Sequence, residues 1–423
     1  MTKADVEDVN PVFFIVGVVR IALLLIMQRF GEVVQMMKTL NVGMLGTGFM
    51  GRTHSNAFNQ VGHFFELPYK TVLKCCYSRN PENAKKFQTI WGYESIETDW
   101  RKIVERDDID IIDVVTPNHL HKDMVVAAAE AGKAVICEKP LAMNSQEAAE
   151  MVAAVEKAGV PSVVSFCYRR NPSVALFKQL VDENRIGRPF HYRATYNQDY
   201  TISEKVPVGG ASLWRLDGKV AGSGVTGDLL AHSIDTAEWL NGPIEKVCAH
   251  TEIFIKERKN VETGEVTPIT IDDACMFLAV FKNGSIGTFE STRYARGRKN
   301  FNTMEMNGSN GACYFNLEEP EYLQFFRYGD PQTGQKVEED HLTGWQKILV
   351  TNKEHPYMDH YWVPGTVIGY EHYFINQLAD FLIQMAGGTP VYPVPTIADA
   401  ARTQKVCDAV IQSAKEERWV KID

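Results

Sequence analysis

Residues 41–51 read Asn41-Val-Gly-Met-Leu-Gly46-Thr-Gly48-Phe-Met-Gly51, a short apolar run that enters a G-x-G-x-x-G turn. A segment compatible with a helix follows, from Arg52 to Phe58. Glycines allow a tight turn and let the backbone approach a pyrophosphate, whose negative charge the N-terminus of the next helix favours. The string alone also fits a glycine-rich turn without a ligand. With a strand before it and a helix after it, the stretch predicts a dinucleotide-binding site.

The size and composition of the chain are those of an ordinary globular protein with more than one domain. A length of 423 residues suggests two domains with sizeable cores. Hydrophobic residues make up 45% of the chain and charged residues 23%, which is typical of globular proteins. The formal net charge of −9 is mildly acidic. We therefore expect no nucleic acid as a partner.

Eight cysteines are spread along the chain, and none of them forms a C-x-x-C pair. Several lie inside apolar runs, which predicts buried, reduced thiols in a cytoplasmic protein. No cluster of histidines and cysteines has the spacing of metal ligands, so we expect no metal site.

Residues 1–38 differ from the rest of the chain and are expected to form an N-terminal extension. Phe13–Met27 is nearly all apolar, but Arg20 interrupts it and acidic residues precede it. An arginine in the middle of a membrane span costs about 2.5–3.5 kcal/mol on insertion scales. Three interpretations stay open: a loosely attached extension with Met37 as the effective start, a membrane anchor, or a helix packed on the body or on a neighbouring subunit. We favour the loose extension over a membrane partner.

Residues 39–160 alternate apolar strand runs with helical segments. Such alternation indicates a parallel sheet covered on both faces, so we expect a dinucleotide-binding Rossmann domain. Ser145 is a plausible N-cap for the last helix. After the first strand and helix, the expected strands are Val72–Tyr77, Ile109–Val115 and Ala134–Cys137, and the expected helices are Lys122–Ala131 and Ser145–Ala158.

Residues 161–423 change character, because strands follow one another closely with few helices between them. This pattern predicts an α+β domain with a large, mainly antiparallel open sheet that binds substrate and forms the oligomer. An open sheet usually needs a partner, so a homodimer or homotetramer is expected. Residues 328–365 are interpreted as an irregular arm or lid. The expected strands are Phe190–Gln198, Val247–Phe254, Ala274–Phe281, Ser285–Ser291, Phe301–Asn307 and Ala312–Asn316, and the expected helices are Pro172–Glu183, Gly227–Leu240, Gly369–Ala386 and Thr396–Glu417.

The end of the second strand bears on the choice of cofactor. An acid that binds the adenosine ribose hydroxyls of NAD normally stands there, whereas this chain has Ser78-Arg79-Asn80. A hydroxyl and a guanidinium can hydrogen-bond a 2′-phosphate that a carboxylate would repel. The sequence therefore favours NADP(H), with NAD(H) as the competitor, unless Arg79 is only a solvated turn residue.

Two further loops follow strands of the same predicted sheet. Thr116-Pro117-Asn118, with His121 close behind, should touch the cofactor, because ligands bind outside the carboxyl ends of such strands. Glu138-Lys139-Pro140 ends the next strand. Lys139 can donate hydrogen bonds to a ribose and to a substrate hydroxyl, and its charge stabilises an alkoxide. The alternative is a surface lysine beside a turn proline.

Asp228 and His232 are four residues apart at the start of a predicted helix, so they share one helix face. A histidine is suited to take a hydroxyl proton near neutral pH, and a nearby carboxylate can orient it or hold substrate. The alternative is that Asp228 caps the helix and that His232 is a core residue.

Together these motifs resemble the family of glucose–fructose oxidoreductase, inositol dehydrogenase and MocA. The resemblance runs from about Thr39 to Ile422 and adds Tyr168-Arg169-Arg170-Asn171-Pro172 and Asp235 to the motifs above. It implies a Rossmann domain followed by a mainly antiparallel α/β domain, with Lys139, Asp228 and His232 as the catalytic set. Ser78-Arg79 departs from the usual acid, as in relatives that use NADP.

The same resemblance extends the candidate sites beyond the catalytic set. A tryptophan face against the apolar side of a pyranose, with charged residues on its hydroxyls, makes a sensible sugar site. Trp214 as a core residue and Arg215 as a surface residue stay open as the alternative. The cofactor candidates are Gly46, Thr47, Gly48, Phe49, Met50, Ser78, Arg79, Thr116, Pro117, Asn118, His121, Glu138 and Lys139, and the substrate candidates are Tyr168, Arg169, Asn171, Asp199, Trp214, Arg215 and His372.

The resemblance implies an NAD(P)-dependent oxidoreductase that transfers hydride between nicotinamide and a secondary hydroxyl of a sugar, glycoside or cyclitol. Two alternatives belong to other classes. One is a glycoside hydrolase that uses tightly held NAD for transient oxidation and elimination. The other is a cofactor-binding regulator without chemistry, against which the intact Lys139, Asp228 and His232 argue.

Overall fold

The computed structural model describes residues 37–328 and 343–422. The predicted N-terminal extension, apart from its last two residues, and part of the predicted arm at 328–365 lie outside the described residues. In the part of the chain that the structure covers, no helix combines the length and the apolar character that a membrane span requires.

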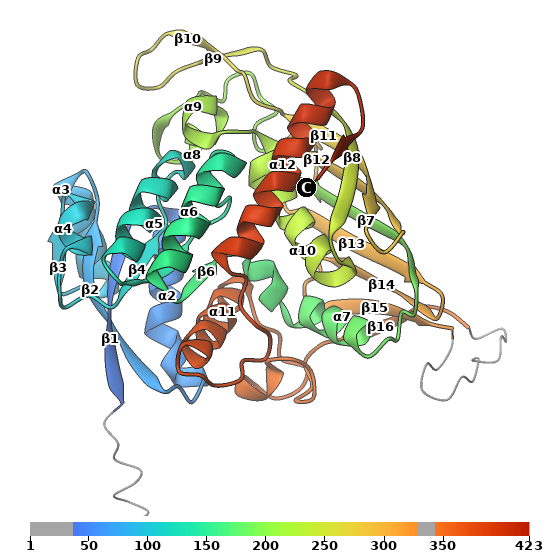
Figure 1. Cartoon of the computed structure of the whole chain (residues 1–423), viewed down its shortest axis with the longest axis horizontal. Coiled ribbons are helices and arrows are strands. Elements are labelled where there is room, and N and C mark those ends of the chain that lie inside the picture. The colour runs from blue at the N-terminus through green and yellow to red at the C-terminus, as the bar shows by residue number, and fades with distance from the viewer. Residues whose placement is uncertain (1–36, 329–342, 423) are drawn as a thin grey trace, which may run out of the picture.

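The first sheet has six strands in the order β3-β2-β1-β4-β5-β6, and every pair is parallel (Figure 1). Its last strand lies beyond residue 160, so this sheet extends past the expected domain boundary. The strands are β1 (Lys38–Leu45), β2 (Tyr69–Tyr77), β3 (Ser95–Glu97), β4 (Ile111–Val114), β5 (Ala134–Cys137) and β6 (Ser162–Val164). The predicted Rossmann domain is confirmed.

Helices connect these parallel strands, and connections of this kind are almost always right-handed. The chain moves outward from β1 in one direction and from β4 in the other, so the two sets of helices cover opposite faces of the sheet. The helices are α2 (Phe49–Phe64), α3 (Pro81–Trp91), α4 (Trp100–Val104), α5 (His121–Glu130) and α6 (Ser145–Ala158). Ser145 is not the N-cap of α6. The side chain of Asn144 accepts a hydrogen bond from the backbone of Glu147 instead, so the cap lies one residue earlier.

The second sheet has nine strands in the order β16-β15-β14-β13-β7-β12-β11-β8-β17. Only the β7–β12 pair in it is parallel, so the predicted mainly antiparallel sheet is confirmed. A separate hairpin, β9 (Glu257–Lys259) with β10 (Val266–Pro268), projects beside it. The strands are β7 (Pro189–Asn197), β8 (Ile244–Glu252), β11 (Ala274–Phe281), β12 (Ile286–Thr292), β13 (Phe301–Gly308), β14 (Gly311–Asn316), β15 (Tyr322–Arg327), β16 (Gln346–Leu349) and β17 (Val420–Lys421).

Four longer helices accompany this sheet, and the last two also join the domains. They are α7 (Pro172–Asp182), α10 (Ala231–Asn241), α11 (Tyr370–Met385) and α12 (Ile397–Glu416). Helix α11 packs on α2, and α12 packs on both α6 and β8. In Figure 1, α12 crosses the front of the molecule between the two sheets. The short helices are α8 (Gly210–Leu213) and α9 (Gly218–Ala221).

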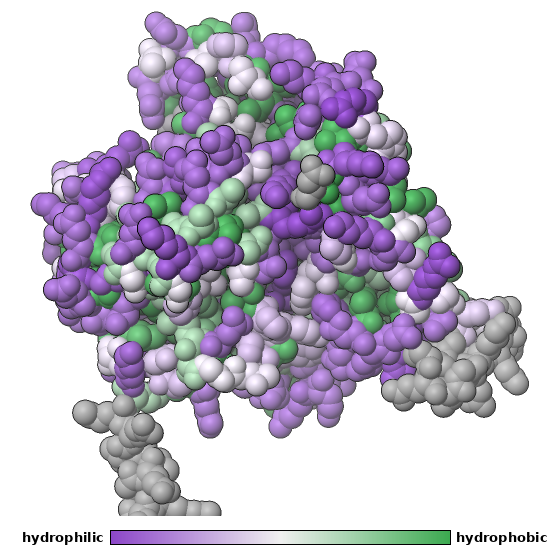
Figure 2. Space-filling model, viewed as in Figure 1, coloured by the Kyte–Doolittle hydropathy of each residue, from purple (hydrophilic) through white to green (hydrophobic). Residues whose placement is uncertain are grey.

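The face of the nine-stranded sheet that turns away from the helices is open. Met276 and Leu278 on β11 and Ile286 on β12 are each at least half exposed, although all three are large and apolar. The helical side of the molecule is mostly hydrophilic in Figure 2. Seven of the eight cysteines are buried, all eight are unpaired, and Cys248 is half-buried on this open face.

Candidate active site

The glycine-rich turn between β1 and α2 has the shape of a phosphate cradle. Gly46 has a φ of +130°, and a Cβ on it would lie 2.9 Å from the carbonyl oxygen of Val115. A Cβ on Gly51 would lie 2.5 Å from the carbonyl oxygen of Gly46. Both positions therefore require glycine for packing reasons.

Gly48 differs from the other two glycines, because a Cβ there would meet nothing within 4 Å. Gly48 is also the N-cap of α2, and no side chain caps the helix. The first N–H groups of a helix of 16 residues therefore face open space beside the turn. These features fit the pyrophosphate of a dinucleotide.

The parallel register brings the neighbouring loops to the same edge. Leu45 pairs with Val114 of β4, and Val114 pairs with Cys137 of β5, so these strands end side by side. The loop that contains Thr116 and the Glu138-Lys139 turn therefore lie next to the glycine-rich turn. This is the edge where doubly wound sheets bind their ligands.

A pocket of about 500 Å³ opens between this edge and the second domain. It combines aromatic walls with several polar and charged groups, as small-molecule sites do. Its lining consists of Phe49, Met50, Glu138, Lys139, Ser165, Cys167, Tyr168, Tyr196, Gln198, Tyr200, Arg215, Asp228, Leu229, His232, Lys299, Asn300, Tyr370 and Phe374. The three predicted catalytic residues are thus brought together in one cavity.

Lys139 and Asp228 form an ion pair across the two domains. The Lys139 ammonium donates hydrogen bonds to the Asp228 carbonyl oxygen, at 2.7 Å, and to its Oδ1, at 3.1 Å. Asp228 lies in a π-helical turn, Thr226–Leu230, that leads directly into α10. Arg293 Nη2 donates to the other carboxylate oxygen at 2.9 Å, and Arg215 Nε lies 3.6 Å from Oδ1. The Asp228 carboxylate therefore lies within ion-pair distance of three cationic side chains, those of Lys139, Arg293 and Arg215.

This cluster fixes the charge of Asp228. Burial disfavours its carboxylate, but Lys139, Arg293 and Arg215 outweigh burial and hold the pKa of Asp228 well below its usual range. The side chain of Arg293 is fully buried. Its guanidinium stays charged and keeps the carboxylate oriented toward Lys139. The sequence left open whether Asp228 orients the histidine or holds substrate; in the structure, its carboxylate accepts hydrogen bonds from Lys139 and Arg293.

His232 stands one turn further along, at the start of α10. Its ring lies 4.5 Å from the ring of Tyr168, measured between centroids. Burial and the charge of Lys139 hold the pKa of His232 well below its ordinary value, so the imidazole is neutral. Neither ring nitrogen has a hydrogen-bond partner among the residues that the structure describes. A neutral, unpartnered imidazole in a pocket can accept a proton from a ligand.

Tyrosines and amides form the opposite wall of the pocket. The hydroxyl of Tyr168 lies 2.9 Å from that of Tyr196. Tyr196 and Gln198 both donate to Oδ1 of Asn300, at 2.8 and 3.1 Å. Groups of this kind can hold several hydroxyls of a polar, uncharged ligand.

Asp199, Trp214 and Arg215 lie around the pocket in different ways. Asp199 does not line it, but pairs at 2.9 Å with Lys299, which does, as do its neighbours Gln198 and Tyr200. Trp214 does not line the pocket; its ring packs against the guanidinium of Arg215, with a distance of 4.4 Å to the ring centroid. Of these three candidates, Arg215 alone reaches the cavity.

The structure does not bring Arg169, Asn171 and His372 into the lining of this pocket. Arg169 is buried and donates two hydrogen bonds to Asp235, at 2.7 and 2.5 Å, so its charge is neutralised internally. Asn171 caps α7 with its side-chain oxygen. His372 accepts from the backbone of Gly369 and packs on Tyr361 instead.

The predicted cofactor-binding residues fall into two groups: some line the pocket, and others contact the neighbouring loops. Phe49, Met50, Glu138 and Lys139 line the pocket. Asn118 and His121 are buried: Asn118 donates to the Ala221 carbonyl, and the His121 ring nitrogens lie 3.0 and 2.9 Å from the carbonyl oxygens of Pro140 and Thr116. In the structure these two side chains therefore make hydrogen-bond contacts to backbone carbonyls of neighbouring loops, and neither lines the pocket. Ser78 and Arg79 follow β2 at the same edge, where Arg79 is exposed.

The sequence pattern did not identify Arg293, nor the wall residues Tyr196, Gln198, Tyr200, Lys299 and Asn300. These residues come from strand ends and turns that carry no motif. The available signal was their position next to the ends of the predicted strands Phe190–Gln198, Ser285–Ser291 and Phe301–Asn307. The sequence pattern did place Tyr370 at the start of a helix near the pocket, and Tyr370 lines the cavity.

Comparisons with known proteins agree with this architecture. A model described as "Oxidoreductase family, NAD-binding Rossmann fold" matches residues 40–166, and one described as "GFO/IDH/MocA C-terminal domain" matches residues 174–314. The chain is 37% identical over 400 residues to levoglucosan dehydrogenase of Pseudarthrobacter phenanthrenivorans, which covers 91% of this chain and 99% of the relative.

Solved structures extend the similarity to three dimensions. A levoglucosan dehydrogenase in complex with NADH and levoglucosan is 37% identical, with a TM-score of 0.84, over 91% of this chain and 100% of that one. An oxidoreductase domain protein from Kribbella flavida is 40% identical, with a TM-score of 0.84, over 92% of this chain and 100% of that one. With its dinucleotide cradle, its open nine-stranded sheet and matches along both domains, the chain belongs to the GFO/IDH/MocA family of oxidoreductases with an NAD-binding Rossmann fold.

Proposed function

We propose that this oxidoreductase oxidises a secondary hydroxyl of a sugar, with Lys139, Asp228 and His232 as its catalytic set. The observation that carries the proposal is the meeting of a lysine ammonium and a neutral, unpartnered imidazole in one pocket beside the glycine-rich cradle. A bound nicotinamide supplies the hydride acceptor. A regulator that binds the cofactor without catalysing a reaction does not need a lysine and a histidine placed for acid–base catalysis, so this pair argues against that alternative.

Each protein group has a defined task in the reaction. His232 takes the proton of the reacting hydroxyl. Lys139 donates a hydrogen bond to the same oxygen and stabilises the negative charge that develops there. Asp228 holds the ammonium in place through two hydrogen bonds. Arg293 holds Asp228 from the far side.

The substrate class follows from the pocket and from the relatives. Levoglucosan dehydrogenase has been crystallised with levoglucosan and with L-sorbose. The tyrosine and amide wall of this pocket suits the hydroxyls of a similar neutral ring, and about 500 Å³ accommodates a monosaccharide beside a nicotinamide. We therefore propose a pyranose or anhydro-pyranose as substrate.

A substrate panel tests this proposal. Levoglucosan, L-sorbose, myo-inositol and aryl glycosides are assayed with NAD and with NADP, and nicotinamide reduction is followed by absorbance. Sugar-dependent reduction of the cofactor is the expected result. Release of an aglycone without net reduction identifies the hydrolytic alternative, and absence of any turnover on the whole panel contradicts the proposed substrate class.

The residues after β2 support a preference for NADP(H), although relatives have been crystallised with NADH. Arg79 is exposed at the edge where the adenosine ribose would lie, and a hydrogen bond to a charged group contributes about 1.5–3 kcal/mol. Arg79→Ala is therefore expected to weaken NADP(H) binding at least about tenfold and to leave NAD(H) binding almost unchanged. Fluorescence titration measures both affinities, with Lys86→Ala on α3 as an exposed control. Tighter binding of NAD(H) by the unaltered protein defeats the preference.

The neutral state of His232 predicts the pH dependence of sugar oxidation. A base works above its pKa, and burial and Lys139 hold the pKa of His232 well below 6.5, while Asp228 opposes this shift. The value of kcat/KM is therefore expected to stay level as the pH falls from about 8 to 6.5, and to decline only below that. A pH series in constant ionic strength measures it. A midpoint at or above pH 6.5 contradicts a depressed histidine pKa.

The open face of the nine-stranded sheet supports a homodimer or a larger homo-oligomer. Met276, Leu278 and Ile286 expose 57%, 51% and 50% of their surface there, and such a contiguous apolar patch usually marks an interface. Met276→Glu together with Leu278→Glu is expected to yield monomers near 47.6 kDa by light scattering. Val266→Glu on the β9–β10 hairpin serves as the control. A monomeric unaltered protein overturns the proposed interface.

A further inference from the structure

Beneath the Glu138-Lys139 turn lies a second buried cluster of charged groups, centred on His54 of α2. Nδ1 of His54 lies 2.9 and 3.1 Å from the two carboxylate oxygens of Asp113 on β4. Its Nε2 lies 3.0 Å from Oε1 of Glu138. All three side chains are at least nine-tenths buried. One imidazole thus bridges two carboxylates from neighbouring strands.

Glu138 connects this cluster to the active site. Its other oxygen, Oε2, accepts a hydrogen bond from the backbone N–H of Lys139 at 3.1 Å. Glu138 also lines the main pocket. The orientation of its carboxylate therefore depends on His54 on one side and determines the backbone of the lysine turn on the other.

The cluster keeps a proton on both nitrogens of His54. Burial opposes the charged ring, but Asp113 and Glu138 outweigh burial and raise the pKa of His54 to about 10. A further polar contact at the ring edge comes from the neutral Ser165, whose Oγ lies 3.3 Å from Nε2. The imidazolium can donate to both carboxylates at once, which a neutral imidazole cannot do.

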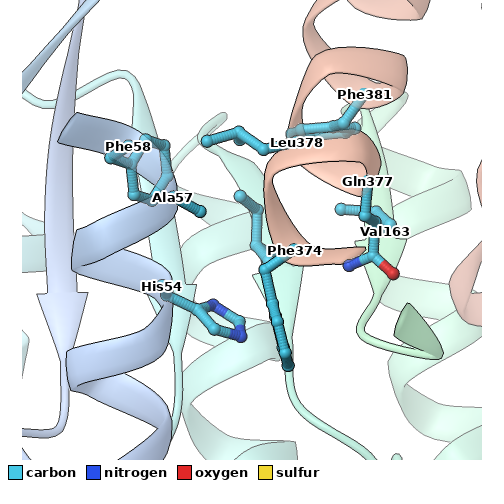
Figure 3. Close-up of a pocket in the computed structure, with 9 residues that line it drawn as sticks. His54, Ala57, Phe58, Val163, Phe374, Gln377, Leu378 and Phe381 are labelled. Atoms are coloured by element: carbon cyan, nitrogen blue, oxygen red, sulfur yellow. The ribbon is translucent and has the colours of Figure 1, made fainter. Parts of the chain in front are cut away.

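Helix α11 of the second domain closes the cluster from the other side. Gln377 donates to Ser165 Oγ at 3.2 Å, and the ring of Phe374 lies 5.4 Å from the His54 ring. Figure 3 shows His54 on α2 facing Phe374 and Gln377 across a small cavity. The cavity is about 20 Å³, close to the space that one water molecule needs. The ring therefore has little room to turn.

Stability alone does not account for this arrangement. A buried ion pair is often no more stabilising than apolar residues of the same volume, because desolvation offsets the attraction. The cluster is instead located at the strand ends that carry the lysine, and one carboxylate is shared between His54 and the lysine backbone. Hydrogen-bonded support of this kind keeps a reacting group in its productive position.

We propose that His54 is a positioning residue for Lys139, acting through the carboxylate of Glu138. The effect expected on kcat rests on the proposed function, whereas the effect expected on the backbone of the lysine turn does not. Without His54, Glu138 turns away from the Lys139 N–H, and the ammonium no longer meets the reacting hydroxyl in the geometry that Asp228 defines.

The test compares His54→Gln, Glu138→Gln and the double variant. A glutamine at 54 can donate to one carboxylate only, and a glutamine at 138 has one acceptor oxygen, so it cannot accept from the protonated His54 and from the Lys139 N–H at once. Each single variant is expected to lower kcat for sugar oxidation about 10- to 100-fold, the loss typical of a small misplacement. The double variant should be no slower than the worse single variant, because both act through one contact.

A second readout does not depend on turnover. Hydrogen exchange at the Lys139 amide, followed by mass spectrometry on peptides that span the turn, should accelerate in both single variants. Ser55→Ala is the matched control, since Ser55 is the next residue of α2, equally buried, and bonds Tyr93 instead. It should change neither kcat nor the exchange at Lys139. Thermal unfolding identifies variants that fail to fold. If His54→Gln fails to fold, the test rests on Glu138→Gln, which keeps the His54–Asp113 pair.

Two results overturn the inference. One is a His54→Gln protein that folds and keeps normal exchange at Lys139. The other is a double variant whose loss in kcat equals the product of the single losses. If the unaltered enzyme oxidises no sugar, the proposed function fails, and the exchange experiment still decides whether His54 positions the lysine turn.

Discussion

Replacing Lys139 with methionine is expected to lower kcat for sugar oxidation by about 1000-fold, the upper range for losing a charged group aimed at a developing oxyanion. The side chain of methionine fills a similar volume but carries no charge and no donor. The Asp228 carboxylate also loses the partner that holds it across the domains. Binding of the dinucleotide should change far less, because the glycine-rich turn and the N-terminus of α2 stay intact. Steady-state kinetics and fluorescence titration with NADH measure the two effects.

Lys133→Met provides the matched control for this variant. Lys133 precedes β5 at its opposite end and donates to the carbonyl oxygen of Arg106, away from the pocket. It should retain normal turnover. Turnover within about tenfold of normal in Lys139→Met would remove the lysine from the proposed mechanism.

Replacing His232 with alanine is expected to lower kcat by about 100- to 10,000-fold, the usual contribution of a general base. The loss should fall on kcat more than on the KM for the sugar, because the tyrosine and amide wall continues to bind the ring. Since the variant leaves a space next to Tyr168, added imidazole should restore part of the activity. Initial rates with and without imidazole measure this rescue.

His191→Ala is a suitable control for the second variant, because His191 is exposed on β7 outside the pocket. It should leave kcat unchanged and show no response to imidazole. If His232→Ala turns over sugar at a rate close to normal, another group takes the proton and the role given to His232 is wrong.

The fold could be predicted from the sequence because local patterns determine most of it. A parallel sheet follows from the glycine-rich stretch at 41–51 and the apolar runs after it. This prediction does not depend on which residues line the pocket. Close succession of strands after residue 190 likewise predicts antiparallel pairing. Strand β16 lies inside residues 328–365, whose partly polar pattern resembles an irregular arm, and β15 is a short strand just before that stretch; the sequence pattern predicts neither of these two strands at the edge of the sheet.

The candidate site could be predicted only in part. Motif residues such as Lys139 and His232 stand at the ends of regular elements, so their convergence follows from topology. Arg293 could not be predicted, since its role arises from a contact with Asp228 that spans 65 positions in sequence. The same applies to Arg169, whose charge looks available for substrate until the fold places Asp235 against it.

A structure of the protein with a nicotinamide cofactor and a sugar substrate tests the central claim most directly. The account predicts that Lys139 Nζ and a ring nitrogen of His232 lie within about 3.2 Å of the same sugar hydroxyl oxygen, whose carbon faces the nicotinamide ring. A closed complex in which the two side chains contact different parts of the sugar, or in which one of them contacts none of it, would contradict the account.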